Sequence, residues 1–356
     1  MSLSVGIVGL PNAGKSTLFN ALLGCQIAEV AERPFTTIEP NTGVVVIPDS
    51  RLERLGQLIK PEKLVSATIK FIDIAGLVKG AHKGEGLGNQ FLSQIRFCDA
   101  ILHLVRAFSN PRVVRPEESL NPLADAEIVN LEMALADLEI VERSLIEAKK
   151  KARVNSDMAA LVGVLEKIKA ALGKDQVTIR TQLTDEEKEI IKELNLLTLK
   201  PMIYILNVDE SGRGQDKNLP SSFPVLEICA ALQAELTGLE NSERQEFAGE
   251  FGLEEGALNQ LIKEAYQLLD LITFYTIKGG KEVHAWPIRK GTKAVVAAGQ
   301  VHTDMARGFI KAEVINVDQL LSIGSWQRSK ELGKLQLQGK DYKVTDGDVV
   351  EFKFSN

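Results

Sequence analysis

The sequence predicts an α/β fold that is interrupted by a pair of long helices and followed by a small, strand-rich domain. Three observations support this prediction. Residues 4–24 have the pattern of a buried strand, a glycine-containing loop and a helix. Residues 124–172 carry apolar side chains at helical spacing, with one polar break. From residue 273 onward, short apolar runs alternate with glycine turns.

The bulk composition is typical of a soluble globular protein. The chain has 356 residues, which suggests two or three domains, and its hydrophobic and charged contents of 44% and 25% are ordinary. No apolar run approaches the ~18 residues of a membrane span, and the start, MSLSVGIVGL, is typical of a first strand rather than a signal peptide. A net charge of -6 argues against coating of nucleic acid but leaves room for a local basic face.

The cysteines give a further indication of the compartment. Cys25, Cys98 and Cys229 are far apart in the sequence, so neither a disulfide framework nor a zinc cluster is indicated. We therefore expect a reducing environment and a cytoplasmic localisation.

The first motif lies between the strand and the helix of residues 4–24. GLPNAGKS matches the phosphate-binding pattern G-x-x-x-x-G-K-[ST], and the flanking strand and helix are the context that this pattern requires. We expect Lys15 to reach the β- and γ-phosphates and Ser16 to bind Mg²⁺. The alternative is a glycine-containing turn that binds nothing. The residues expected to surround the phosphates are Asn12, Ala13, Gly14, Lys15, Ser16 and Thr17.

Two further motifs fit a nucleotide switch. Thr36 and Thr37 are in a polar stretch before a strand, where a threonine such as Thr37 would sense the γ-phosphate through Mg²⁺. Downstream, an apolar strand at 69–74 contains the start of Asp73-Ile-Ala-Gly76, a D-x-x-G motif. Asp73 would hold Mg²⁺ through water, and the Gly76 N–H would meet the γ-phosphate.

The residues after this motif concern the hydrolysis step. Leu77 occupies the position at which Ras-like enzymes place the Gln that orients water, so hydrolysis must use other groups and be slow without a partner. The next segment is rich in glycine and contains His82, which is either a solvated residue or a catalytic group. His103, in an apolar strand at 100–108, is expected to be a core residue.

The stretch ILNVDES, residues 205–211, raises the question of which base is bound. A Ras-like GTPase has N-K-x-D here, and an Asp carboxylate accepts both N1–H and the 2-amino group of guanine. Val208 can only pack on a base, and Glu210 is one methylene longer than Asp and must bend or point away. Asn207 can donate and accept, which suits the N6/N7 edge of adenine. Losing a charge-assisted contact costs roughly 1.5–3 kcal/mol, which predicts weak guanine selectivity without establishing an adenine preference.

Four stretches together resemble the YchF family of Obg-like P-loop NTPases: GLPNAGKST, PFTTIEPNTGVV, DIAGLVKGAHKGEGLGNQFL and the N-x-x-E stretch at residue 207. The resemblance covers nearly the whole chain. It implies a Ras-like NTPase domain, an inserted helical hairpin and a C-terminal β-grasp (TGS) domain. It also implies a preference for ATP over GTP, with Mg²⁺ beside the nucleotide, and association with ribosomes.

The resemblance also implies roles for two further segments. Cys229, Ala230 and Ala231 occupy the place of a loop whose backbone N–H groups contact the base in GTPases. Family members commonly place a His in the segment after the fourth strand, and the matching position here is Arg115. An Arg cannot be a general base but can stabilise transition-state charge. The alternative is that Arg115 is a surface residue.

The inserted helices can also be predicted from the residues alone. Ile128, Leu131, Leu135, Leu138 and Leu145 form one apolar series, and Leu161, Leu165, Ile168 and Leu172 form a second. This rhythm predicts an antiparallel coiled-coil hairpin, with a helical bundle buried in one domain as the alternative. The basic run at 149–153 is either a solvated tip or a contact for a phosphate backbone.

Basic charge is concentrated in the C-terminal part of the chain. From residue 273, 13 Lys and Arg stand against 9 Asp and Glu, a net charge of +4, against about -10 for the rest. Such a module fits contact with rRNA, or, alternatively, a mildly basic domain with only protein partners. The expected domains are the NTPase domain at 1–122 and 199–272, the helical insertion at 123–198 and the TGS domain at 273–356.

Three functions remain open from the sequence: a slow, Mg²⁺-dependent ATPase associated with translation, an Obg-type GTPase, and a nucleotide-gated adaptor with little hydrolysis. The expected partners are ATP and the ribosome, in particular its large subunit, with rRNA contacted by the coiled coil and the TGS domain. No membrane partner is expected, and the chain is expected to be a monomer.

Overall fold

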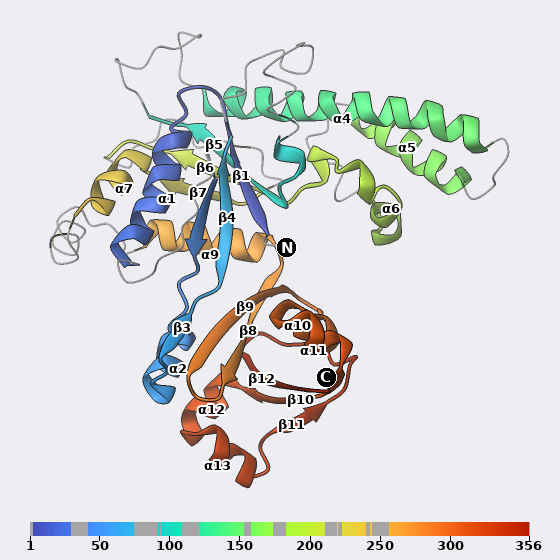
Figure 1. The fold of residues 1–356 in the computed structure, drawn as a ribbon. Helices are drawn as coiled ribbons and strands as arrows, with labels where there is room; N and C mark the ends of the chain where they lie inside the picture. The colour runs from blue at the N-terminus through green and yellow to red at the C-terminus, as the bar shows by residue number, and fades with distance from the viewer. Residues whose placement is uncertain are drawn as a thin grey trace. The chain divides into compact units, whose positions relative to one another are not determined.

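The computed structural model describes residues 3–29, 42–74, 92, 94–108, 121–152, 158–173, 183–210, 219, 223–239, 243 and 256–355. They form two compact units (Figure 1). The first unit, which we call the P-loop unit, comprises the described parts of 3–44 and 70–258. The second, the C-terminal unit, comprises 45–69 and the described residues from 259 onward.

A six-stranded sheet organises the P-loop unit, in the order β2-β4-β1-β5-β6-β7. β1 pairs in parallel with β4 and β5, β5 with β6, and β6 with β7. Every residue of β1, β5 and β6 is buried, as expected for parallel strands covered on both faces. The strands are β1 (Ser4–Val8), β2 (Thr42–Val46), β4 (Thr68–Asp73), β5 (Ala100–Arg106), β6 (Met202–Asn207) and β7 (Val225–Ile228).

This topology places the predicted motifs at one edge of the sheet. β1 leads into the glycine loop and helix α1 (Lys15–Glu29), β4 ends at Asp73, and β6 ends at Asn207. β7 leads into helix α7 (Ala230–Thr237). The carboxyl ends of parallel strands meet at the same edge, which is where open α/β sheets bind ligands.

Helix α4 (Pro122–Ala152) contributes to two hydrophobic cores. Its first half packs on the sheet through Val129, Met133 and Ala136, in a cluster that includes Val8. Its second half shares a separate core with α5 (Met158–Leu172), to which it contributes Val141, Leu145 and Ala148. The predicted pair of helices is therefore confirmed, and α4 is shared between the hairpin and the sheet.

The predicted apolar series on the first helix is correct in part. Leu145 is buried, Leu138 is partly buried against the same core, and Ile128 and Leu135 are also partly buried. Leu131 is 47% exposed, because the buried face of α4 also uses small Ala and Val side chains and leaves this leucine outside. The second series is correct, because Leu165, Ile168 and Leu172 are buried and Leu161 is partly buried. Lys149, in the basic run, pairs with Glu166 across the hairpin at 2.7 Å.

The buried carboxylate of Asp137 fixes α4 to the elements beneath it. Asp137 has no exposed surface, and Oδ1 accepts from Arg96 Nη1 at 2.8 Å. The same carboxylate accepts hydrogen bonds from the backbone N–H groups of Leu197 and Thr198 and from the Thr198 hydroxyl. Short helices continue the insertion: α6 (Asp185–Ile190), η3 (Lys192–Leu194) and η4 (Leu197–Leu199).

His103 is a core residue, as predicted. It is 1% exposed, and burial lowers its pKa to about 3, so the imidazole is neutral at physiological pH. Its ring lies 5.0 Å from that of Tyr204, whose hydroxyl accepts from Asn130 Nδ2 on α4 at 2.7 Å. This polar group lies between the sheet and α4.

The C-terminal unit has a second six-stranded sheet, in the order β11-β10-β12-β8-β9-β3. β8 and β9 form the predicted antiparallel hairpin, whose turn contains Gly279 and Gly280 at φ 58° and 72°. The last strand, β12, lies between β10 and β8. The strands are β3 (Lys63–Val65), β8 (Leu271–Lys278), β9 (Glu282–Arg289), β10 (Phe309–Asn316), β11 (Gln336–Gln338) and β12 (Asp348–Phe354).

Helices accompany this sheet. Residues of α10 form a core with one face of the sheet that includes Phe274, Val314 and Phe352. The helices of the unit are α2 (Ser50–Ile59), α9 (Ala257–Leu268), α10 (Ala294–Val301), α11 (Thr303–Arg307), α12 (Val317–Ile323) and α13 (Trp326–Glu331). In the described part of the chain, no helix combines the length and apolarity that a membrane crossing needs.

The segment 45–69 differs from the expected domain organisation. The sequence predicts that it belongs to the NTPase domain at 1–122, whereas in the structure it packs with the C-terminal unit. α2 buries Leu52 and Leu55, and β3 extends the C-terminal sheet beside β9.

Candidate functional site

The loop after β1 has the backbone conformation of a phosphate-binding loop. Gly9 has no room for a side chain, because a Cβ there would lie 2.3 Å from the backbone oxygen of Leu104. Gly14 has φ 98°, which L side chains rarely adopt, and its Cβ would lie 2.3 Å from Asn207 Nδ2. Asn12 also has positive φ, at 62°. The two glycines of the motif are therefore required by local geometry, and the loop opens directly into the N-terminus of α1.

Lys15 lies across the loop that it belongs to. Its Nζ donates to the Leu10 carbonyl at 2.9 Å, and the residue is 7% exposed. Burial lowers the pKa of the ammonium to about 8, and the nearby Asp73 carboxylate opposes that shift. A buried, destabilised cation with a carbonyl partner is suited to take the negative charge of a phosphate.

Ser16 and Asp73 form the centre of the candidate metal site. The Ser16 hydroxyl donates to Asp73 Oδ2 at 2.8 Å. Among the described residues, Asp73 Oδ1 is buried without a hydrogen-bond partner. A hydroxyl, a carboxylate and an unsatisfied carboxylate oxygen form a hard oxygen donor set, which fits Mg²⁺ and its water.

Asn207 links the P-loop to the loop before α7. It is 4% exposed, its Nδ2 donates to the Ala13 carbonyl at 2.9 Å, and its Oδ1 accepts from the Ala230 N–H at 3.0 Å. An Asn amide has one further N–H and one further lone pair, and with respect to the described residues these are available for a base. The Ala230 N–H is used by Asn207, so any base contact from Ala230 must come from another group.

The other residues predicted to contact the nucleotide base follow Asn207 in the sequence or lie in the loop before α7. Val208 is 7% exposed and packs in the core cluster of the sheet, with its N–H bonded to the Ile228 carbonyl. Glu210 is exposed. The pKa of the Cys229 thiol is raised, mainly by burial and also by the carboxylates of Glu210 and Asp209. The contact of Glu210 and Cys229 with a base stays a prediction.

The remaining predicted residues lie outside the described part of the chain. These are Thr36, Thr37, Gly76, Leu77, His82 and Arg115. Their assigned roles stay predictions. Nothing in the sequence pattern indicated the structural role of Asn207, although a buried Asn at a strand end, with both amide groups to satisfy, is a general signal for such a link.

Comparisons with known proteins agree with this geometry. Residues 4–143 match the family model MMR_HSR1, described as "50S ribosome-binding GTPase", and residues 271–355 match YchF-GTPase_C, described as "Protein of unknown function (DUF933)". The chain is 46% identical over 364 residues to "Ribosome-binding ATPase YchF" of Escherichia coli O157:H7, covering 100% of both chains. It is 43% identical over 367 residues to the Bacillus subtilis (strain 168) protein of the same name, again covering 100% of both.

A solved structure extends this likeness to the fold. The chain matches the structure titled "Structure of the Schizosaccharomyces pombe YchF GTPase" with a TM-score of 0.88 and 33% identity, covering 99% of this chain and 98% of the other. Full-length similarity at this level, together with a P-loop that has the geometry described above, places the chain in the YchF family.

Proposed function

We propose that this chain is a ribosome-binding ATPase that hydrolyses ATP slowly at its P-loop. The observation that carries the proposal is the site formed by Lys15, Ser16 and Asp73, with Ser16 and Asp73 joined at 2.8 Å. The site occurs in a chain that matches relatives named "Ribosome-binding ATPase YchF" over their full length.

The phosphates bind at the loop and the N-terminus of α1. Backbone N–H groups from Asn12 to Thr17 face them, and Lys15 exchanges its bond to the Leu10 carbonyl for a phosphate oxygen. A Mg²⁺ ion bound with the nucleotide would supply positive charge to neutralise the charge on the β- and γ-phosphates. Ser16 and Thr37 are its proposed protein ligands, and Asp73 orients its water.

The names of similar proteins differ in the nucleotide base that they imply, adenine or guanine. The curated relatives are called ATPases, whereas the S. pombe structure and the matching family model are called GTPases. We favour ATP because the curated relatives are named ATPases, and because the replacement of the guanine-reading Asp by Glu210 and of the Lys by Val208 predicts weak guanine selectivity. The second candidate is a GTPase, because Glu210 is exposed and keeps a carboxylate near the position of the guanine-reading Asp.

Hydrolysis is proposed to be slow in the isolated protein. Leu77 cannot orient the attacking water, so the reaction depends on other groups. We propose His82 and Arg115 as the side chains that assist, with stimulation when a ribosome binds. A nucleotide-gated adaptor with little hydrolysis is the outcome if neither contributes.

The partner surfaces follow the domain organisation. We propose that residues 1–122 and 199–272 carry the chemistry, and that the insertion at 123–198 and the TGS domain at 273–356 contact rRNA of the large subunit. The net charge of +4 from residue 273 onward supports the last point. We further propose that the protein acts in the cytoplasm as a monomer.

The deciding experiment compares fluorescent ATP and GTP analogues in equilibrium titrations with the full chain. The proposal predicts tighter binding of the ATP analogue and turnover of ATP that increases with ribosomes. Lys15→Ala should abolish turnover without unfolding the protein. Lys192→Ala is the matched control, because Lys192 is an exposed lysine paired only with a neighbour on the same turn. Tighter GTP binding would favour the GTPase, and unchanged turnover in Lys15→Ala would reject the P-loop as the site.

A further inference from the structure

The segment between the P-loop unit's strands β2 and β4 belongs to the C-terminal unit. Residues 45–69 form α2 and β3, and both elements pack with residues that are more than two hundred positions away in the sequence. These residues join the two predicted switch motifs in the sequence, and they pack with the C-terminal domain.

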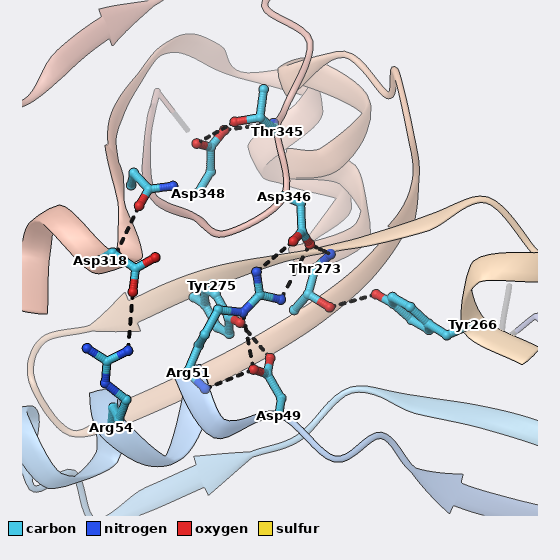
Figure 2. A network of polar contacts seen from close by, with 11 residues as sticks. Asp49, Arg51, Arg54, Tyr266, Thr273, Tyr275, Asp318, Thr345, Asp346 and Asp348 are labelled. Carbon is cyan, nitrogen blue, oxygen red and sulfur yellow. Dashed lines mark hydrogen bonds and ion pairs between the residues drawn. The ribbon is translucent and has the colours of Figure 1, made fainter. Parts of the chain in front are cut away.

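A polar network fixes the start of α2 (Figure 2). Asp49 caps the helix by accepting from the Arg51 N–H at 3.0 Å, and its other oxygen accepts from the Tyr275 hydroxyl of β8 at 2.5 Å. Burial and the adjacent Asp49 carboxylate raise the pKa of Tyr275, so this hydroxyl remains a donor. The Arg51 guanidinium lies over the Tyr275 ring, 5.7 Å from its centroid.

Asp346 extends the network to the strands of the C-terminal sheet. Its Oδ2 accepts from Arg51 Nη1 at 2.6 Å, and its Oδ1 accepts from the Thr273 N–H of β8 at 2.9 Å. The Thr273 hydroxyl is 2.7 Å from that of Tyr266 on α9. Figure 2 shows Arg51 between Asp49 and Asp346, with Thr273 and Tyr266 beyond them. One guanidinium therefore joins α2 to β8 and to the loop before β12.

Backbone pairing and apolar burial hold the rest of the segment. Lys63, Leu64 and Val65 pair in parallel with residues 282–284 of β9, and the Lys63 N–H donates to the Lys281 carbonyl at 3.0 Å. Leu52 and Leu55 are 3% and 0% exposed. The segment is therefore an integral part of the C-terminal fold.

A cavity of about 1010 Å³ lies beside the network, but its chemistry is that of a structural cleft. Its charged lining is balanced, with four basic and four acidic side chains. The most central of these, Asp49, Arg51 and Asp346, are bonded to one another. The lining charges are Arg51, Lys263, Lys290, Lys343, Asp49, Glu53, Asp270 and Asp346.

Strand β4 connects this anchored segment to the candidate metal site. Its residues Thr68 and Ile69 belong to the C-terminal unit, whereas Lys70–Asp73 pair with β1 in the P-loop unit. Ile69 and Asp73 are four residues apart, about 13 Å in an extended strand. Asp73 is the residue that binds Ser16, so the metal site and the C-terminal fold lie on one short strand.

We propose that the C-terminal domain and the nucleotide site regulate each other through residues 45–69, with the Arg51–Asp346 pair as the anchor. This inference rests on the proposed function, because it requires that a nucleotide binds at the P-loop. Binding with Mg²⁺ replaces the Ser16–Asp73 hydrogen bond, and the change at Asp73 is carried along β4 to the anchored segment. A partner that binds the C-terminal domain then changes the affinity for nucleotide by some factor. By thermodynamic linkage, nucleotide must change the affinity for that partner by the same factor.

Hydrogen exchange of the full chain, with and without Mg²⁺-ADP, tests the proposal. The expected result in the wild type is slower exchange in residues 47–67 and in the C-terminal amides that they contact, those of Thr273 and of β9. Asp346→Asn keeps an oxygen for the Thr273 N–H but removes the charge that binds Arg51. It should remove at least half of the nucleotide-dependent change in the β8 and β9 amides, and leave the change in the P-loop amides intact. Arg51→Met is a second variant with the same expected result.

Asp318→Asn is the matched control. Asp318 pairs with Arg54 of the same helix α2, but both side chains are more than half exposed, so the pair is expected to hold α2 weakly. The control should retain the wild-type response. Thermal unfolding and a fluorescent-ADP titration on each variant separate the outcomes. Failure of ADP to bind the wild type rejects the proposed function and, with it, this coupling. Binding without any change in the C-terminal amides, or an unaltered change in both anchor variants, overturns the coupling and leaves the proposed function standing.

Discussion

The burial of Lys15 makes nucleotide affinity dependent on pH above neutrality. Its pKa in the free protein is lowered to about 8, because burial disfavours the ammonium and Asp73 offsets that effect only in part. A bound phosphate favours the charged form, so binding raises this pKa. The protonated form is the one that binds tightly. Affinity is therefore full well below pH 8 and is lost as the pH rises through 8.

The size of the effect follows from the free-state pKa. With a pKa of about 8, about one free molecule in eleven has a neutral Lys15 at pH 7, and about ten in eleven at pH 9. The apparent Kd should rise about tenfold over this interval, which is about 1.4 kcal/mol. At pH 8, each binding event should take up about half a proton.

The assay is a titration with fluorescent ADP at pH 7, 8 and 9 and constant ionic strength, with calorimetry in two buffers of different ionisation enthalpy. Phosphate groups, whose second pKa is near 6, are already ionised in this range and contribute little. Lys15→Arg is the control, because a guanidinium stays protonated throughout and its weaker binding should be independent of pH. A wild-type Kd that changes less than twofold between pH 7 and 9, or no proton uptake at pH 8, would refute the reasoning.

Three other predictions concern stability, the loop and the base. Asp137→Ala should lower the free energy of unfolding by about 3–5 kcal/mol in urea denaturation, because it removes one partner of the half-buried Arg96 guanidinium and leaves two buried N–H groups without their acceptor. Asp185→Ala, at a 98% exposed side chain, should cost far less. Gly14→Ala should weaken nucleotide binding more than tenfold in the same titrations, because of its φ of 98° and its close neighbour. Gly163→Ala, with nothing within 4 Å of the new methyl group, should bind nucleotide as the wild type does. Glu210→Asp should improve binding of the GTP analogue about tenfold relative to the ATP analogue, by the value of one charge-assisted hydrogen bond, and an unchanged ratio would place base selection elsewhere.

The P-loop could be predicted from the sequence because its fixed residues all lie within one short motif. Gly9 and Gly14 are required by contacts with the distant residues Leu104 and Asn207, but the motif itself specifies both glycines. The apolar series of α5 was also predictable, because its large residues face one partner. The buried face of α4 was predicted only in part, because two different cores bury it and because Ala and Val residues take part in both, while Leu131 is exposed.

The assignment of residues 45–69 could not be predicted for a different reason. Arg51 and Asp346 are 295 positions apart, and no local pattern encodes such a partner. The helix at 50–59 has an ordinary amphipathic sequence that would fit either unit, and β3 has only three residues. Val208 illustrates the same limit within the site. Its position in the motif suggested a base contact, but its burial at 7% exposure depends on the whole sheet.

Helix α4 is long and is held at one end by the core of the P-loop sheet, so the helical insertion acts as a stiff rod that is fixed at that end. Its 31 residues correspond to about 46 Å. If the far end were deflected by about 5 Å about a pivot at Pro122, a rigid rod of that length would tilt by about 6° and move Met133 by about 2 Å. Met133 is 2% exposed in a close-packed core, which does not deform smoothly by that amount. A force applied at the far end of α4 would therefore either bend the helix beyond the core residues that hold it or displace the strands that support it. In the second case the force would act on β5 and β6 directly, without any loop in between.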